Sequence, residues 1–210
     1  MKILKIITLA VFILLLPLHS FSQNTKKMKG FLKFGTGVYL DISRLSDYKT
    51  SKDVNTGLSP QAVVPGKTIW VEGGYNFNNG LFVSAGVMYE LTKRKRTDIF
   101  YPGQKELYFE ENYSLNIGYE FNLGKGNRFM PALGVLYNRL TTSYAAFTPG
   151  INNSIHPVLL NNIDAEIGLN LLLDYYYQFN NNLFLGVRAS VYYVLGWEGV
   201  TLTPVIGVKF

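Results

Sequence analysis

The stretch Val200–Phe210, VTLTPVIGVKF, decides the fold of this chain. Its apolar positions are Val200, Leu202, Pro204, Ile206, Val208 and Phe210. The positions between them are mostly small or polar, and this period of two is typical of a β-strand whose two faces meet different surroundings. A soluble protein rarely ends on an unpaired apolar strand, because such an edge promotes aggregation. A closed transmembrane barrel can end this way, since its last strand pairs with its first and a terminal aromatic ring lies at the membrane interface.

The composition agrees with a small barrel. The chain has 210 residues, enough for one domain, with 15 Tyr, 14 Phe and 20 Gly but only 16% charged residues. Membrane barrels place aromatic residues in girdles at the two interfaces, and small residues in the lumen. The absence of Cys excludes a disulfide framework, a thiolate metal site and a lipidated N-terminal cysteine.

The N-terminus has the pattern of a secretory signal peptide. Two lysines precede the apolar run 6–18, and small residues follow it. We predict a signal peptide over residues 1–22, cleaved after Ser22, and a barrel over residues 23–210. The alternative, a membrane-anchor helix, needs about 20 apolar residues, more than this run supplies. Loss of the two lysines lowers the formal net charge from +6 to +4, and this scattered remainder does not indicate nucleic-acid binding.

Eight segments of the remaining chain alternate between apolar and polar residues. They are 30–42, 68–77, 81–92, 106–121, 128–140, 159–178, 183–195 and 200–210. We expect long loops at 43–67, 93–105 and 141–157, tight turns at 78–80, 122–127 and 180–182, and a moderate connection before the last strand. Outer-membrane barrels have short periplasmic turns and longer external loops, and an even strand number places both termini in the periplasm. The sequence therefore predicts an all-β fold, an eight-stranded antiparallel up-and-down transmembrane β-barrel in the cell outer membrane.

Aromatic residues gather at the ends of the apolar faces, where rings favour the lipid–water boundary. Those near the tight turns are Tyr75, Phe77, Tyr119, Phe121, Phe129, Tyr177, Phe179 and Phe210. Those toward the long loops are Tyr89, Phe109, Tyr113, Tyr137 and Tyr193. We interpret them as two belts. No stretch after the N-terminus has 18 uninterrupted apolar residues, which disfavours a helical membrane protein.

The chain resembles the small outer-membrane β-barrel family of Bacteroidota, often called PorT-like. The resemblance depends on Phe21-Ser22-Gln23 at the end of the signal, on the alternating strands, and on the terminal Gly207-Val208-Lys209-Phe210. It covers residues 30–210 and implies fold and location rather than activity. It also implies that Phe210 is part of the signal read by the barrel assembly machinery. No functional residue is carried over from the family.

The polar faces of the strands carry many ionisable groups, which we expect to form a charge network inside the lumen. They are Lys33, Asp41, Glu72, Glu90, Glu110, Glu120, Asp164, Glu166, Asp174, Arg188 and Lys209. An eight-stranded barrel is just wide enough to be filled by side chains, and buried charges must be paired or hydrated. Counting back from the turn at 180–182 places Asp174 opposite Arg188, and we expect Glu72 or Glu166 to contact Arg188 as well. A stabilising plug is favoured over an ion pathway.

A run of four cations, Lys93, Arg94, Lys95 and Arg96, begins the second long loop. It can bind phosphates of lipopolysaccharide by charge and hydrogen bonding, or it is an ordinary solvated loop edge. Both interpretations stay open. The expected partners are outer-membrane lipid, lipopolysaccharide and the barrel assembly machinery, without nucleic acid.

The sequence offers little for catalysis. His156 is the only histidine after processing, and with nearby Ser154 it forms a poor base–nucleophile pair because no orienting acid is evident. A lone imidazole does not make a metal site. We expect no catalytic residue, no metal and no cofactor.

Four functions remain as hypotheses. The first is a non-enzymatic outer-membrane barrel whose loops contact lipopolysaccharide or a partner. The second is a narrow pore for small solutes. The third is a lipid-modifying enzyme at the rim, and the fourth is a soluble barrel that holds a ligand in an apolar interior.

Overall fold

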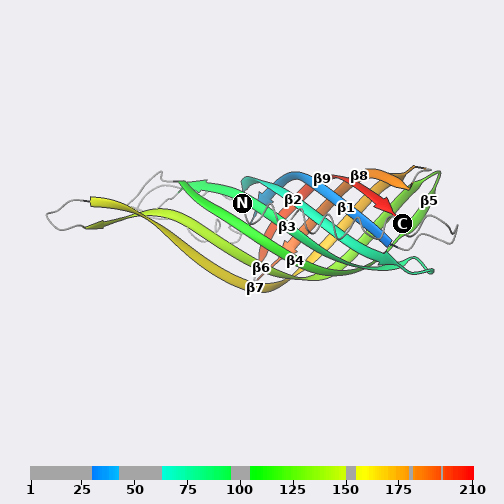
Figure 1. The fold of residues 1–210 in the computed structure, drawn as a ribbon, viewed down its shortest axis with the longest axis horizontal. Helices are drawn as coiled ribbons and strands as arrows, with labels where there is room; N and C mark the ends of the chain where they lie inside the picture. The colour runs from blue at the N-terminus through cyan, green and yellow to red at the C-terminus, as the bar shows by residue number, and fades with distance from the viewer. Residues whose placement is uncertain (1–29, 43–62, 96–104, 150–154, 180–181, 195) are drawn as a thin grey trace.

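The computed structural model describes residues 30–42, 63–95, 105–149, 155–179, 182–194 and 196–210 (Figure 1). The strands in these ranges are β1 Gly30–Asp41, β2 Val64–Asn76, β3 Leu81–Lys95, β4 Lys105–Tyr119, β5 Phe121–Gly124, β6 Asn127–Pro149, β7 Ile155–Gln178, β8 Leu183–Tyr193 and β9 Trp197–Lys209. These ranges contain no helix long and apolar enough to cross a membrane. The proposed signal peptide lies outside the described residues.

The strands close into one antiparallel ring. Their order is β4-β3-β2-β1-β9-β8-β7-β6-β5, and pairing of β4 with β6 completes the circuit. β4 and β5 are two parts of one strand, interrupted at Glu120, so the ring has eight positions. The first and last strands pair from Phe31 opposite Lys209 to Asp41 opposite Gly199. The prediction of a closed eight-stranded antiparallel barrel is confirmed.

The barrel is apolar outside and polar over much of its interior. Along β9, Leu202 and Ile206 expose 63% and 53% of their surface, whereas Thr203 exposes 0% and Lys209 6%. The most exposed apolar side chains are Ile167 at 74% and Leu115 at 70%. Burial of apolar surface is the main stabilising term for folding in water, so this wall is suited to a hydrocarbon environment. The predicted facing of the strands is confirmed, and the polar interior contradicts the hypothesis of a soluble barrel with an apolar cavity.

The long connections differ from the prediction. β6 and β7 continue as a paired hairpin through the expected loop 141–157, from Thr141 opposite Ile163 to Pro149 opposite Ile155. Figure 1 shows this hairpin projecting beyond the other strands, at the end opposite the C-terminus. Likewise β2 begins at Val64, and β3 and β4 stay paired as far as Lys95 and Lys105. Antiparallel neighbours can extend their ladder past the barrel wall, because each supplies the other's backbone hydrogen bonds.

An aromatic layer fills the end of the lumen near the tight turns, which the prediction of a wet, ionic interior did not include. Phe31, Phe82 and Phe184 are each 1% exposed. Each lies directly opposite a glycine on the adjacent strand, and the pairs are Phe31 with Gly74, Phe82 with Gly118, and Phe184 with Gly207. A side chain at any of these glycines would collide with the facing ring. The missing side chain thus makes the space in which the ring packs.

Candidate functional site: the lumen

Four charged side chains fill the centre of the lumen, and we call Lys33, Glu72, Asp174 and Arg188 the central cluster. They come from β1, β2, β7 and β8, and none exposes more than 5% of its surface. Lys33 Nζ lies 2.7 Å from Asp174 Oδ2 and 3.3 Å from Glu72 Oε1. Arg188 donates to Asp174 at 2.6 and 2.7 Å, and its Nη2 lies 2.9 Å from Glu72 Oε2. The cluster holds two positive and two negative charges, so its formal charge is zero.

Arg188 of the central cluster stacks on the indole ring of Trp70. The guanidinium carbon of Arg188 lies 3.8 Å from the centroid of the Trp70 ring, and Trp70 Nε1 donates to Thr203 Oγ1 at 2.9 Å. A guanidinium on an aromatic face gains cation–π attraction and still keeps its in-plane N–H groups for carboxylates. Lys33 Nζ also lies 4.6 Å from the centroid of the Phe31 ring, so the cluster adjoins the aromatic layer.

A smaller group of ion pairs lies at the end of the lumen near the tight turns. Glu120, at the break between β4 and β5, forms ion pairs with Lys209 and with Arg128, the latter at 3.4 Å. Asn76 Nδ2 donates to Glu120 Oε2 at 2.7 Å. Lys209 Nζ lies 5.3 Å from the centroid of the Tyr176 ring. Two cations therefore share one carboxylate at this end.

The end of the lumen near the long loops is acidic and amide-rich. Glu90 and Glu110 are buried and directly opposite each other on β3 and β4. Asn112 Nδ2 donates to Glu90 Oε2 at 3.2 Å, and Asn138 Nδ2 donates to Glu110 Oε2 at 3.3 Å. A third amide, Asn170 on β7, donates to Asn116 on β4 at 2.9 Å, and the two meet over Gly134 of β6. A side-chain amide thus donates to one oxygen of each of the two carboxylates.

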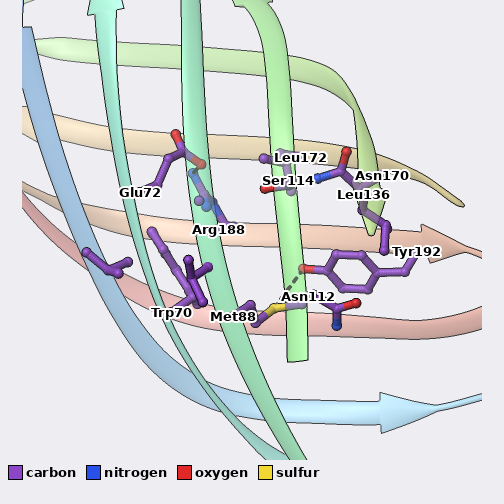
Figure 2. Close-up of a pocket in the computed structure, with 13 residues that line it drawn as sticks. Trp70, Glu72, Met88, Asn112, Ser114, Leu136, Asn170, Leu172, Arg188 and Tyr192 are labelled. Atoms are coloured by element: carbon purple, nitrogen blue, oxygen red, sulfur yellow. Dashed lines mark hydrogen bonds and ion pairs between the residues drawn. The ribbon is translucent and has the colours of Figure 1, made fainter. Parts of the chain in front are cut away.

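The lumen contains a cavity of about 20 Å³ between the central cluster and the side-chain amides of Asn112 and Asn170. Figure 2 shows Arg188 and Glu72 on one side of it, with Tyr192, Asn112 and Met88 on the other. The Tyr192 hydroxyl donates to Met88 Sδ at 3.2 Å. A cavity of this size has room for about one water molecule, and its lining includes both polar and apolar side chains. It is too small for a sugar, a nucleotide or a lipid.

The predicted pair of Asp174 and Arg188 is present, and of the two carboxylates offered for Arg188 the structure selects Glu72. Asp164 is exposed and Glu166 half-buried, unlike the buried members of the central cluster. Both lie where β7 continues beyond the last residue of β8, since Tyr193 is opposite Leu169. The role of Trp70 under Arg188 was not predicted, although its place beside Glu72 on an inward face was a signal.

The structure describes the candidate residues near the long loops only in part. Lys93 is exposed on the outer face of β3; the side chains of Arg94 and Lys95 are not described, and Arg96 and Ser154 lie outside the described residues. His156 is opposite Thr148 in the projecting hairpin, but its side chain is likewise not described. Within the described ranges, no group of three or more His, Cys, Asp or Glu side chains could hold a metal ion.

Phe210 closes the ring at the end near the tight turns. Its backbone exchanges two hydrogen bonds with Gly30, at 2.8 and 2.9 Å. Its side chain exposes 36% of its surface on the outer wall. The exposed aromatic residues Tyr75, Phe77, Tyr119, Phe121, Tyr177 and Phe179 lie at the same end. Tyr113, Tyr137 and Tyr193 lie exposed toward the other end, as expected for two belts.

Solved structures of outer-membrane barrels share this fold. The chain matches a major outer membrane protein from Thermus thermophilus with a TM-score of 0.57 and 16% identity, over 87% of this chain and 99% of that one. It also matches Neisserial surface protein A, with 15% identity, a TM-score of 0.48 and coverage of 87% and 97%. Ail, the attachment invasion locus protein of Yersinia pestis, matches with 12% identity, a TM-score of 0.48 and coverage of 87% and 99%.

No family model matches the chain, and no curated protein matches it significantly. At 16% identity the match to the Thermus thermophilus protein bears on the fold alone, and activity has to be argued from the residues.

Proposed function

We propose that this chain is an integral outer-membrane β-barrel without enzymatic activity. Its role is structural, or it makes contacts at the membrane surface through the end that carries the long loops. The observation that carries the proposal is the inverted distribution of side chains. Leu115, Ile167 and Leu202 expose more than 60% of their surface, whereas Lys33, Glu72 and Arg188 are buried. Hydrocarbon is the solvent in which such a wall is stable. We propose as well that the chain belongs to the PorT-like family of Bacteroidota, which its sequence resembles.

Membrane insertion is tested by expression in a Gram-negative host. The protein should stay in the outer-membrane fraction after washing with urea or alkaline carbonate, and it should resist denaturation by SDS until heated. Release into the soluble fraction by carbonate would contradict membrane insertion.

We propose that the long-loop end faces outward and that both termini are periplasmic. The chain contains no Cys, so single substitutions give clean labelling sites. Lys93 on β3 and Lys125 in the β5–β6 turn lie at opposite ends of the barrel, and both are exposed. A membrane-impermeant maleimide on intact cells should label Lys93→Cys and spare Lys125→Cys. The reverse pattern would invert the orientation.

The filled lumen supports a structural role over transport. The central cluster and the aromatic layer lie one behind the other along the interior, and the cavity between the cluster and the amides holds about one water. The purified protein should therefore show no steady openings in planar bilayers. Glu72, Asn112 and Arg188 in the lining of this cavity keep a narrow pore as the second candidate, and steady single-channel openings would favour it.

We propose further that the outward-facing cations of the loop end bind lipopolysaccharide phosphates. Lys67 on β2 and Lys93 on β3 are both exposed on the outer wall, and Lys67 is opposite Leu91, two residues before Lys93. A cation in this position meets headgroup phosphates by charge and hydrogen bonding. The variant Lys67→Glu/Lys93→Glu should bind lipopolysaccharide vesicles more weakly than the wild type. Lys125→Glu, at the opposite end, is the matched control, and equal losses in both would contradict this assignment.

A further inference from the structure

Strand β7 has an open edge at the long-loop end of the barrel. Its pairing with β8 ends at Leu169 opposite Tyr193, whereas its pairing with β6 continues to Ile155 opposite Pro149. On the β8 side, residues 155–167 therefore lie next to no strand of the described chain. Figure 1 shows this part of β7 in the hairpin that projects beyond the other strands. One side of the hairpin is thus a strand edge rather than part of the closed wall.

The alternation of the backbone shows which residues point their hydrogen-bonding groups to this edge. Gln178 N–H donates to Gly126, which precedes β6, and Phe179 N–H donates to Leu183, the first residue of β8. Successive residues of a strand bond to alternate neighbours, and the register of β7 with β6 has no shift. Odd-numbered residues of β7 therefore point to β8 and, beyond its end, to the open edge. Those with an N–H and a C=O group at the edge are Leu159, Asn161, Ile163 and Ala165.

Pro157 limits the open edge toward the hairpin tip. It has the same parity, so its ring nitrogen lies where another residue would place a donor at the edge. Proline occurs in sheets mainly at edges, because it cannot donate to a ladder. The segment 159–165 is thus the part of β7 that can accept a further strand.

The two faces of this segment differ in chemistry. Ile163 and Ile167 lie on the outer face and expose 53% and 74% of their surface. Glu166 lies on the inner face, where its opposite residue on β6 is the uncharged Asn138. A strand added at the edge would place apolar side chains beside the two isoleucines and a side chain directly beside Glu166. Opposite charges in such cross-strand pairs stabilise a sheet.

We propose that this edge binds an extended segment of another protein by antiparallel strand addition, with a basic residue facing Glu166 and apolar residues on the outer face. Main-chain hydrogen bonds supply affinity in this mode of recognition, and alternate side chains supply specificity. A second copy in the same membrane fits less well, because its β7 would run in the same direction and could not pair antiparallel. The proposal deepens the contact role proposed above for the loop end.

The probe is a short, fluorescently labelled peptide of alternating lysine and valine, titrated into the mature chain refolded in uncharged detergent micelles. In the proposed pairing its valines lie opposite Ile163 and Ala165, and these are the hydrogen-bonded pairs. Methylation of the valine backbone nitrogens should therefore weaken binding at least ten-fold. Methylation of the lysine backbone nitrogens, which point away from β7, is the matched control and should leave binding nearly unchanged.

Variants of the protein test the same edge. Ala165→Pro removes an N–H from the open edge and none from the ladder with β6, so it should weaken binding at least ten-fold. Ala165→Val keeps this N–H and is its control. Glu166→Gln should weaken binding about three-fold, as expected for a partly exposed ion pair, whereas Glu111→Gln on the outer wall of β4 should not.

Four results would overturn the docking site. They are no binding of the lysine–valine peptide, equal binding of the two methylated peptides, wild-type binding by a folded Ala165→Pro variant, and self-association that Ala165→Pro abolishes, which would assign the edge to a second copy. If Ala165→Pro does not fold, the methylated peptides decide, since they need only the wild type. Binding in micelles does not depend on membrane location or orientation, so this proposal and the proposed function can fail separately.

Discussion

Arg188 on β8 binds Asp174 on β7 with two parallel hydrogen bonds, from Nε to Oδ1 at 2.6 Å and from Nη2 to Oδ2 at 2.7 Å. The two residues are opposite each other in the strand register. This fork-to-fork arrangement is the geometry in which a guanidinium recognises a carboxylate most strongly. With Glu72 and Lys33 it makes a neutral ionic centre in a barrel whose wall is apolar.

Replacing Arg188 with Ala should destabilise the barrel strongly. The change leaves Glu72 and Asp174 buried with only Lys33 between them, and removing one partner of a buried ion pair costs about 3–5 kcal/mol. Urea unfolding in micelles, followed by the heat-modifiable mobility of the folded barrel, measures the loss. Arg139→Ala is the control, because the pair of Arg139 with Glu111 is partly exposed and should contribute about 0–1 kcal/mol. Equal losses in the two variants would contradict the central role of Arg188.

Gly74→Ala should be costly and Gly73→Ala nearly neutral, although the two glycines are adjacent on β2. Gly74 faces inward against the Phe31 ring, and a Cβ there would also come within 2.6 Å of the Val83 carbonyl oxygen. At Gly73 the nearest atoms would be 3.9 Å away, in ordinary contact. Overpacking in a filled interior typically costs about 1–3 kcal/mol. Parallel urea titrations test the difference. Similar midpoints would show that the aromatic side chains can repack around the added methyl group at little cost in stability.

Leu115→Arg should impair insertion into bilayers. Leu115 exposes 70% of its surface midway along β4, between the two aromatic belts. A charged residue at the middle of the lipid-facing wall costs about 2–4 kcal/mol, and the cost falls to about 0–1 near the interfaces. Leu123→Arg on β5, beyond the Phe121 ring, is therefore the control. Folding yield into lipid vesicles measures both, and a more soluble, fully folded Leu115 variant would argue against membrane insertion.

Phe210→Ala should reduce assembly in cells far more than stability in vitro. The backbone hydrogen bonds between Phe210 and Gly30 do not depend on the ring, which is one-third exposed on the outer wall. A recognition role for the ring predicts less folded protein in the outer membrane at equal synthesis. The refolded variant should keep its free energy of unfolding within about 1 kcal/mol of the wild type, as for other partly exposed positions. A parallel loss of stability would instead make the ring a closing contact of β1 and β9.

Sequence reasoning succeeded where the signal repeats every two residues. Alternation along Val200–Phe210 and the other strands determined which residues face inward, because a strand offers only two faces. Neighbouring strands joined by tight turns also fix their own register, so Asp174 could be placed opposite Arg188 by counting. The closed ring followed from the need to leave no unpaired edge in lipid.

Only the tertiary structure decided which inward residues meet across the lumen. Lys33 and Asp174 are 141 positions apart, and their contact depends on the tilt and stagger of the whole ring. The same stagger brings Phe31 against Gly74 and leaves Asp164 beyond the edge of β8. Periodicity in a sequence specifies the face that a side chain occupies, whereas its neighbours inside the barrel depend on how eight strands close around one axis.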